Sequence, residues 1–395
     1  MLDHLFVIGY PSDIGGANTE LWHTVKLWRR FGLGVTLVPT AEPDPKWRTR
    51  LDAIGCRTAD DLRFMIYDCR LKSDSANHKS EIINHKSPVP PVVVAFCNER
   101  FLAAADSFRE LGCRIVWLGC MNWLFPTERL HYARRGCFDR HVFQSRYQRA
   151  QLVPQLRRFG FRDEQGAVIR GAFDATEFPF RPRPHAPSET FTIGRISRAA
   201  ADKFSPQTWR ICGRIREAIA CGTGVRPAVG RSFTASLPGR SEAPSHILGQ
   251  SPLRARVLGW STEVEARVGP PPEWAECLPA GSCPSQEFLA TLGALVHAGG
   301  TAAENWPRVG LEAMAAGVPV VADRRGGWPN MIRHGETGYL CDDELQFADY
   351  TARLANDEPL RQAIIQRARH SLETELADPA AIWAAWQQLF EGLDR

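Results

Sequence analysis

The sequence predicts an α/β protein built from two Rossmann-like, doubly wound domains. Its 395 residues are too many for one ordinary domain and fit two. Short apolar runs alternate with amphipathic helical segments, and this series occurs twice along the chain. A stretch with four prolines, Phe178 to Glu189, separates the two series and has the composition of a linker. We therefore expect domains at residues 1–180 and 190–375, followed by a terminal helix at 376–395.

The first series begins with an apolar strand, Leu5 to Ile8, whose following loop reaches Gly15-Gly16. A helix is expected from about Thr19 to Phe31, because apolar residues recur on one face and Gly32 follows as a stop signal. Residues 71–90 carry a repeated Asn-His-Lys-Ser tetrapeptide and are expected to form an exposed loop insertion. Further buried strands are expected at Val35 to Val38, Pro91 to Phe96, Arg114 to Leu118 and Asp139 to Phe143.

The second series begins with a strand at Phe191 to Gly194. Residues 230–254 are rich in Ser, Pro and Gly, so a loop or small insertion is expected there. Further strands are expected at Val257 to Leu258, Leu295 to His297 and Val318 to Val321. The last helix starts at Asp378-Pro379, a capping residue followed by a residue that suits the first turn. One face of this helix is apolar and carries Ile382, Trp383, Trp386, Leu389 and Phe390.

Composition and charge are typical of a globular enzyme. The chain is 44% hydrophobic and 23% charged, and its net charge of +4 argues neither for nor against nucleic acid. The charge is unevenly spread, because ten arginines stand between Arg129 and Arg170 against Asp139, Asp163 and Glu164. Two interpretations remain open: solvated helical faces, or a basic face for anionic lipid or an acidic acceptor.

The cysteine pattern gives no support to a metal site. Eleven cysteines are scattered without a Cys-x-x-Cys pair, which fits free thiols in a reducing compartment. No apolar run approaches the roughly 18 residues of a membrane span. We therefore expect a cytoplasmic protein, and any contact with the inner membrane face would be peripheral.

Two glutamates, Glu304 and Glu312, bracket the start of a predicted helix. Pro307 suits the beginning of that helix and Gly317 its end. Glu304 is therefore expected in a loop, and Glu312 about a turn and a half inside the helix. Backbone N–H groups and the positive end of the helix dipole lie between them and favour phosphate. Because carboxylates accept hydrogen bonds from sugar hydroxyls, the pattern suggests a nucleotide-sugar. The alternative is an ordinary helix–strand unit with solvated glutamates.

The run from Glu304 to Asp323, with Arg324 to Gly327 and Asn330 to Leu340, resembles a known donor site. It is similar to the donor-site region of family 4 retaining glycosyltransferases (glycosyl transferases group 1), which have the GT-B fold. The resemblance implies two domains that face each other across a cleft, with the last helix crossing back onto the first domain. It also implies roles for four residues. Glu304 would be catalytic and contact the donor sugar, Glu312 would bind the ribose, and the N–H groups near Arg308 and Val309 would bind phosphate.

Two further segments resemble the family at the carboxyl ends of predicted strands, where ligands bind in open α/β sheets. Gly15 and Gly16 stand where the family has a Gly-Gly loop that touches the donor, and glycine permits close approach of the backbone. Arg195 and Lys203 correspond to its phosphate ligands, because two cations can neutralise a diphosphate leaving group. The spacing before Lys203 is longer than in many members, so Arg198 is the substitute.

The sequence departs from the family at two places. Many members have glycine where this chain has Pro307, which cannot donate an N–H there. Many also carry a histidine after the strand that corresponds to Arg114 to Leu118, where this chain reads Gly119-Cys-Met-Asn-Trp123. On this acceptor side, either Asn122 or a backbone carbonyl would hold the sugar, and Ser145 could reach the cleft. Trp123 is expected to pack in the core or between domains, and the alternative is an acceptor platform.

The sequence therefore predicts a retaining glycosyltransferase that transfers sugar from a nucleoside-diphosphate sugar to an acceptor hydroxyl. The acceptor would be a glycan or lipid-linked molecule in glycan, glycolipid or surface-polysaccharide synthesis, with no nucleic-acid partner. We expect neither cofactor nor metal, because Arg195, Lys203 and the helix N-terminus supply positive charge and no Asp-x-Asp cluster is present. The alternatives are a nucleotide-sugar epimerase of the same fold and a non-catalytic nucleotide-sugar-binding protein.

Overall fold

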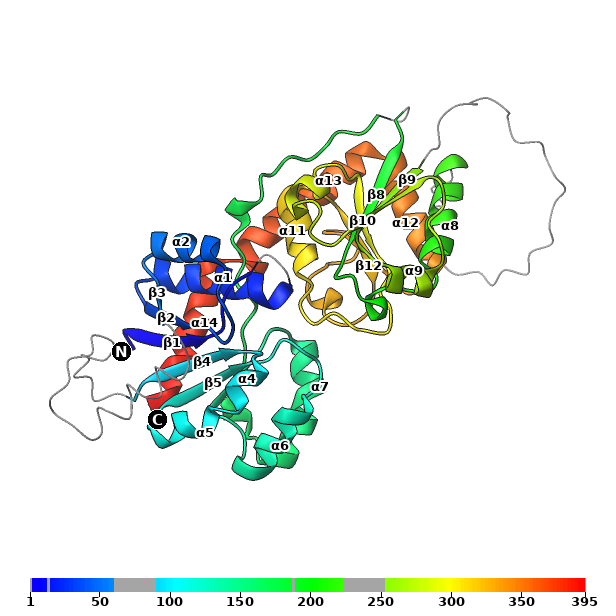
Figure 1. Cartoon of the computed structure of the whole chain (residues 1–395). Coiled ribbons are helices and arrows are strands. Elements are labelled where there is room, and N and C mark those ends of the chain that lie inside the picture. The colour runs from blue at the N-terminus through cyan, green and yellow to red at the C-terminus, as the bar shows by residue number, and fades with distance from the viewer. Residues whose placement is uncertain (1, 13–14, 60–89, 187–188, 223–252, 395) are drawn as a thin grey trace.

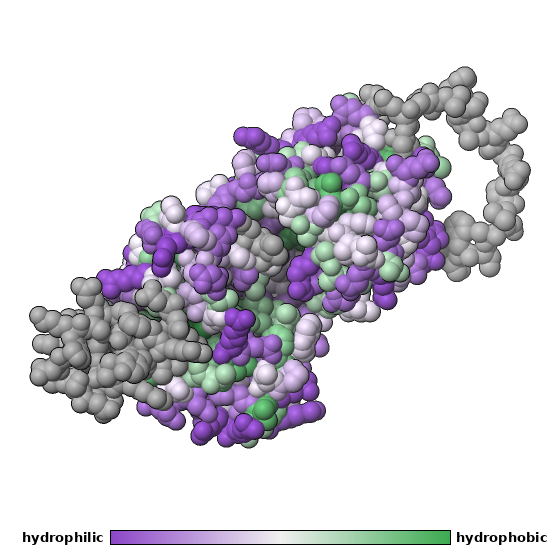
Figure 2. All heavy atoms as spheres, viewed as in Figure 1, coloured by the Kyte–Doolittle hydropathy of each residue, from purple (hydrophilic) through white to green (hydrophobic). Residues whose placement is uncertain are grey.

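The structure is a computed structural model that describes residues 2–12, 15–59, 90–186, 189–222 and 253–394. Two parallel sheets with packed helices organise it, which confirms the predicted α/β class (Figure 1). The surface is mostly hydrophilic. Apolar atoms are recessed where the two lobes, the parts of the structure built on the first and the second sheet, meet (Figure 2). Nearly all of the two predicted insertions lies outside the described residues. The domain limits at 1–180, 190–375 and 376–395 stay predictions.

The first sheet has seven strands in the order β3-β2-β1-β4-β5-β6-β7, and every pair is parallel. The strands are β1 His4–Ile8, β2 Gly34–Val38, β3 Arg57–Thr58, β4 Val92–Phe96, β5 Arg114–Leu118, β6 Arg140–Phe143 and β7 Gly166–Val168. The sequence predicted the five longer strands and missed β3 and β7, which are too short to show a periodic pattern. The order reverses between β1 and β4, so their carboxyl ends mark the expected ligand edge.

Six of the described helices pack with the first sheet. They are α1 Gly16–Arg30, α2 Pro45–Ala53, α4 Glu99–Leu102, α5 Ala105–Glu110, α6 Pro126–Arg135 and α7 Arg146–Leu156. Asp44 caps α2 and Ser145 caps α7 through their side chains. Helix α1 begins three residues earlier than predicted, because Gly15 takes a φ of 95° that a residue with a side chain rarely adopts.

The second sheet has six parallel strands in the order β10-β9-β8-β11-β12-β13. The strands are β8 Phe191–Ile196, β9 Leu253–Trp260, β10 Ala275–Pro279, β11 Ala294–His297, β12 Val320–Asp323 and β13 Tyr339–Cys341. The predicted loop at 230–254 is wrong at its end, because Leu253 and Arg254 already belong to β9 and pair with β8. The order reverses between β8 and β11, which places a second ligand edge at their carboxyl ends.

Seven α-helices are described in this half of the chain and in the terminal segment. They are α8 Thr208–Ala220, α9 Thr262–Val268, α10 Ser285–Leu289, α11 Arg308–Ala316, α12 Glu344–Asn356, α13 Glu358–Ser371 and α14 Pro379–Glu391. Shorter 3₁₀ segments occur at Arg157–Phe159, Asp163–Gln165, Ala175–Glu177, Ala201–Lys203, Trp328–Asn330 and Gly392–Asp394, and a π-helical turn at Leu372–Leu376. The predicted end of α11 is confirmed, because Gly317 follows it with a left-handed φ of 83°.

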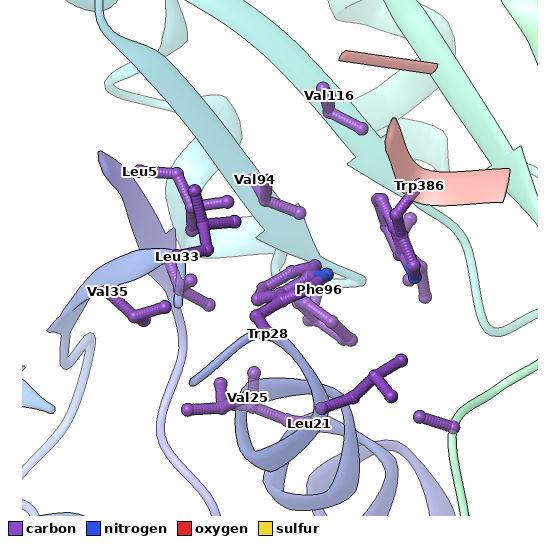
Figure 3. Close-up of a cluster of buried hydrophobic side chains, with 14 of the residues drawn as sticks. Leu5, Leu21, Val25, Trp28, Leu33, Val35, Val94, Phe96, Val116 and Trp386 are labelled. Carbon is purple, nitrogen blue, oxygen red and sulfur yellow. The ribbon is translucent and has the colours of Figure 1, made fainter. Parts of the chain in front are cut away.

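The terminal helix α14 packs against the first sheet, as predicted. Asp378 caps it, and its apolar face joins the core formed by α1 and strands β1, β2, β4 and β5. The Trp386 and Trp28 rings meet edge to face with centroids 4.9 Å apart, next to Phe96 (Figure 3). The chain therefore passes to the second sheet and returns to complete the core of the first.

One buried carboxyl of the first lobe predicts a pH dependence of stability. Glu128 is 3% exposed in α6, where it accepts from the Phe125 N–H at 2.8 Å and from the Tyr132 hydroxyl at 3.3 Å. Burial outweighs these hydrogen bonds and raises its pKa from 4.5 to about 7. Between these two values the native state keeps a proton that the unfolded chain has lost, so stability falls as pH rises.

We expect Glu128→Gln to remove this loss, because glutamine keeps an acceptor oxygen and carries no charge. The free energy of unfolding of the variant, relative to wild type, should rise by about 3 kcal/mol between pH 4.5 and pH 8. Urea denaturation across this range measures the difference, with the exposed Glu110→Gln as the control. A difference that stays constant with pH would contradict the prediction.

Candidate functional site

The predicted site residues gather where the carboxyl ends of the two sheets face each other. The Gly15-Gly16 turn at the start of α1 lies next to the start of α11, since a Cβ built on Gly16 would stand 3.6 Å from Cδ of Arg308. Within the described chain, no side chain caps either helix. Two helix N-termini and one guanidinium therefore converge, which is an arrangement that attracts an anion.

Glu304 lies beside Lys203 at this edge. Lys203 Nζ donates to Glu304 Oε1 at 3.0 Å, and His297 Nε2 stands 3.9 Å from the same oxygen. The Glu304 side chain is 23% exposed, so it can be reached from the cleft. The structure thus brings together two predicted site residues that are 101 positions apart in the sequence.

The loop that carries Glu304 depends on the glycine pair Gly326-Gly327. The Gly327 N–H donates to the carbonyl of Glu304 at 2.7 Å. A Cβ on Gly327 would lie 1.7 Å from the carbonyl oxygen of Asn305, and one on Gly326 would lie 2.3 Å from that of Glu304. Only glycine allows this approach, because a side chain would displace the backbone that positions Glu304.

Arg195 is placed behind Lys203. Its side chain is buried, Nη1 donates to the Ala298 carbonyl at 2.8 Å, and Nη2 donates to the Lys203 carbonyl. Its guanidinium also lies over the Phe204 ring, 4.5 Å from the centroid, and burial lowers its pKa to about 10. Arg195 therefore holds the backbone that presents Lys203, and its direct contact with phosphate stays a prediction. Arg198, the substitute, is exposed.

Arg308 connects the start of α11 to the first lobe. Its Nη1 donates to the carbonyl of Ala172 at 3.0 Å, and its guanidinium lies 5.5 Å from the centroid of Phe173. Glu312 is partly buried one turn further along α11, where burial raises its pKa and the nearby Arg308 charge opposes the rise. Val309 packs on the apolar core of the second sheet. Its side chain is thus structural, which leaves its backbone for the predicted phosphate contact.

The acceptor-side residues divide into two groups. Asn122 Nδ2 donates to the Ala303 carbonyl at 2.9 Å, and Ser145 Oγ donates to Asn305 Oδ1 at 2.7 Å. Two residues of the first lobe therefore form hydrogen bonds to the residues on either side of Glu304. Trp123, in contrast, is 47% exposed, so the expectation that it packs in the core or between domains is wrong. The exposed ring is compatible with the alternative, in which Trp123 is a platform for the acceptor, and that role stays a prediction.

Three buried polar side chains form a series of hydrogen bonds between the two lobes, and the sequence did not predict it. Asn305 Nδ2 donates to Gln144 Oε1, and Gln144 Nε2 donates to Glu20 Oε2 of α1. All three side chains are at least 94% buried, and burial raises the pKa of Glu20. Gln144 follows β6 directly, and Asn305 follows Glu304, so strand-end position was the available signal. Sequence spacing alone could not pair residues more than 120 positions apart.

His297 at the end of β11 was also missed as a neighbour of the site. It is 2% exposed, and its Nδ1 stands 4.0 Å from Asp323 Oδ1. Burial and the charges of Arg195 and Lys203 hold its pKa well below the usual range. A neutral imidazole therefore stands between the carboxylates of Glu304 and Asp323.

The described residues contain neither a metal-binding cluster nor a membrane-spanning helix. No group of three or more His, Cys, Asp or Glu side chains in this part of the chain is arranged to hold a metal ion. Among the described helices, none is long and apolar enough to span a membrane.

Sequence comparison identifies the segment that contains Glu304 and Glu312. Residues 283–371 match the family model described as glycosyl transferases group 1. The chain is 46% identical over 71 residues to N-acetyl-alpha-D-glucosaminyl L-malate synthase of Bacillus anthracis, covering 18% of this chain and 19% of that protein. It is 46% identical over 61 residues to D-inositol 3-phosphate glycosyltransferase of Corynebacterium diphtheriae, covering 15% and 14%. The chain thus spans about a fifth or less of the length of these curated relatives.

Structural comparison extends over almost the whole chain. Anabaena HepE, solved in complex with UDP-glucose, superimposes with a TM-score of 0.62 at 17% identity over 99% of both chains. A mutant of S. aureus TarM, solved with fondaparinux, alpha-GlcNAc-glycerol and UDP, gives 0.65 at 10% identity over 98% and 99%. The predicted resemblance to group 1 glycosyltransferases and the GT-B fold are confirmed. Assignment to family 4 stays a prediction.

Proposed function

We propose that this protein is a retaining glycosyltransferase that moves a sugar from a nucleoside-diphosphate sugar to an acceptor hydroxyl. One observation carries the proposal: Glu304 and Lys203 form an ion pair beside two converging helix N-termini. The match to group 1 glycosyltransferases over residues 283–371, which include Glu304 and Glu312, supports it. Relatives of the same fold that bind UDP or UDP-glucose give further support.

The proposed chemistry assigns separate tasks to the two charged groups. The bond between the anomeric carbon and the diphosphate oxygen breaks, and the acceptor oxygen forms a bond to that carbon from the same face. Negative charge grows on the leaving diphosphate, where Lys203 and the start of α11 stabilise it. The departing phosphate takes the acceptor proton, and Glu304 positions the donor sugar through its hydroxyls. The protein's own charges thus fill the role that a metal has in other transferases.

The contacts between the lobes indicate how water would be excluded. Asn122 and Ser145 of the first lobe form hydrogen bonds to the Glu304 loop of the second lobe. If the lobes separate, both hydrogen bonds break and the loop loses its support. We propose that the catalytic arrangement is complete only when the lobes are together, which limits hydrolysis of the donor.

A thermal-shift screen tests the function. We expect UDP, GDP, ADP or one of their sugars to raise the unfolding temperature, since a ligand at 100 times its Kd adds about 2.7 kcal/mol of stability. UDP is the first choice, because one structural relative was solved with UDP-glucose and the other with UDP. No shift with any nucleotide would overturn the proposal. Incubation with donor alone tests the epimerase alternative, which requires release of an epimerised sugar.

Trp123 gives a prediction about the acceptor. Its neighbour Asn122 binds the residue before Glu304, and nearly half of the Trp123 surface is exposed, so a sugar ring can stack near the reacting centre. We expect Trp123→Ala to raise the acceptor KM about tenfold, the loss of roughly 1.4 kcal/mol of binding, while the donor KM stays unchanged. Initial-rate kinetics measure both constants. Trp123→Phe, which keeps an aromatic face, should recover most of the affinity, and equal effects on donor and acceptor would refute the assignment.

The arginine-rich segment of the first lobe suggests where a lipid-linked acceptor is presented. Between Arg129 and Arg170 the ten arginines exceed the nearby acids, and Leu130 is 52% exposed on α6 among them. We propose that the protein is cytoplasmic and makes peripheral contact with the anionic inner face of the membrane. Co-sedimentation with phosphatidylglycerol vesicles, compared with phosphatidylcholine vesicles, tests this contact. Equal binding to both would exclude a role for charge.

A further inference from the structure

A cavity of about 550 Å³ lies between α1 and the two segments through which the chain crosses between the lobes. The outgoing segment contributes residues 172–176, and the returning segment contributes residues between Arg369 and Ile382. The volume falls within the range of small-molecule sites, roughly 300–1,000 Å³. The cavity is built from parts of the chain that the proposed reaction does not use.

The cavity combines apolar walls with cations. Its apolar lining includes Leu27, Ile54, Phe173, Pro379 and Ile382. Four cationic side chains, Lys26, Arg29, Arg30 and Arg369, face two acids, Asp174 and Glu373. Such a lining suits a molecule that has both an apolar body and a charged group.

Internal ion pairs show which of these charges are already balanced. Lys26 Nζ stands 2.5 Å from Asp174 Oδ2, and Arg369 Nε stands 2.6 Å from Glu373 Oε1. Among the described residues, Arg29 donates to the carbonyls of Ile54 and Leu33 and has no acidic partner, and Arg30 has none either. In the part of the chain that the structure describes, two guanidinium charges in the last turn of α1 are therefore without a carboxylate partner, so the preferred ligand is an anion.

We propose that this cavity binds an anionic amphiphile, a molecule with an alkyl or acyl chain and one carboxylate or phosphate group. The chain would occupy the apolar part of the cavity, and the head group would meet Arg30 and Arg29. Each CH₂ group that leaves water adds to the affinity, so a medium-length chain supplies most of it. The head group supplies the choice of anion over neutral ligand.

The cavity shares a wall with the candidate donor site. Ala172 and Phe173 line it, and both contact Arg308 at the start of α11. The returning segment contains the π-helical turn Leu372–Leu376, a local irregularity that often marks functional positions. An occupant that moves the outgoing segment therefore also moves the contact of Arg308, which couples the cavity to nucleotide binding. This coupling rests on the proposed function, whereas ligand binding in the cavity does not.

Isothermal titration of the full chain without nucleotide tests the binding site. Decanoate should bind saturably at one site, and 1-decanol should bind at least tenfold more weakly. Arg30→Glu should weaken decanoate binding at least tenfold, while Arg158→Glu, an exposed site outside the cavity, should leave it unchanged. Thr176→Trp should fill the cavity and abolish binding, and Ala175→Trp repeats the test if the first variant unfolds. Unsaturable binding, equal binding of 1-decanol, or unchanged binding in both tryptophan variants would overturn the proposal.

The coupling has its own measurement. Saturating decanoate should change the Kd for UDP at least threefold, and UDP should change the decanoate Kd by the same factor. An unchanged UDP Kd in the presence of bound decanoate would overturn the coupling and leave the binding site standing. A protein that binds decanoate and no nucleotide would instead overturn the proposed transferase function.

Discussion

Glu304→Gln is expected to lower the rate of sugar transfer about 10²-fold or more, a cost of roughly 2.7 kcal/mol in the transition state. The substitution keeps the size of the side chain and removes its charge. The ion pair with Lys203 is then lost, and the donor sugar loses a charged acceptor of hydrogen bonds. Affinity for UDP should change less than threefold, because UDP lacks the sugar that Glu304 is proposed to hold.

Two measurements separate a role in transfer from a role in folding. Initial rates with donor and acceptor give the loss of activity, and titration calorimetry gives the Kd for UDP. Glu336→Gln is the matched control, because Glu336 is an exposed glutamate paired with Arg333 outside the cleft. A Glu304→Gln variant that keeps a third of the wild-type rate would exclude Glu304 from the mechanism. Parallel loss of UDP binding would show that the variant damages the site as a whole.

Trp386→Ala is expected to lower the free energy of unfolding by about 3–5 kcal/mol. Trp386 is 2% exposed in the terminal helix, and its ring contacts Trp28 at 4.9 Å and Phe390 at 5.5 Å between centroids. Removal of the indole leaves a cavity at the point where α14 completes the core of the first sheet (Figure 3). The variant should therefore detach α14 as well as lose stability.

Trp383→Ala provides the comparison on the same helix. Trp383 is only partly buried and stacks on Phe31, which is 38% exposed, so its loss should cost about 1 kcal/mol. Urea denaturation followed by circular dichroism measures both variants. Limited proteolysis should cut the chain near residues 372–378 faster in Trp386→Ala than in wild type. Equal cost for the two tryptophans would contradict the packing described for α14.

Elements with strong local signals were predicted nearly to the residue. β5 has the predicted bounds. α11 lies between Pro307 and Gly317 as predicted, because proline and glycine have conformational preferences that operate within a few residues. Elements without such signals were missed. β3 spans two residues and β7 three, which is too few for periodicity to separate a strand from a loop.

The candidate site was predicted as a set of residues and not as a set of contacts. Glu304, Lys203 and Gly16 were named from motifs at strand ends, and the structure brings them to one edge. The direction of the Arg195 side chain was not predictable, because it depends on hydrogen bonds to the carbonyls of Ala298 and Lys203. The exposure of Trp123 also depends on neighbours that are distant in the sequence.

The amino-acid sequence was sufficient to predict the α/β class, the helix that starts between Glu304 and Glu312, and the residue types that can meet a diphosphate and a sugar. The fold class and the helix follow from backbone preferences and periodicities that act over one or two turns, and the site residues follow from the resemblance to a known donor site. The folded structure was needed to show that Lys203 pairs with Glu304, that Asn122 and Ser145 bind the Glu304 loop, and that α14 packs on the core of the first sheet. Such contacts join residues more than 100 positions apart, and they result from the packing of whole sheets and helices, in which no single local preference dominates.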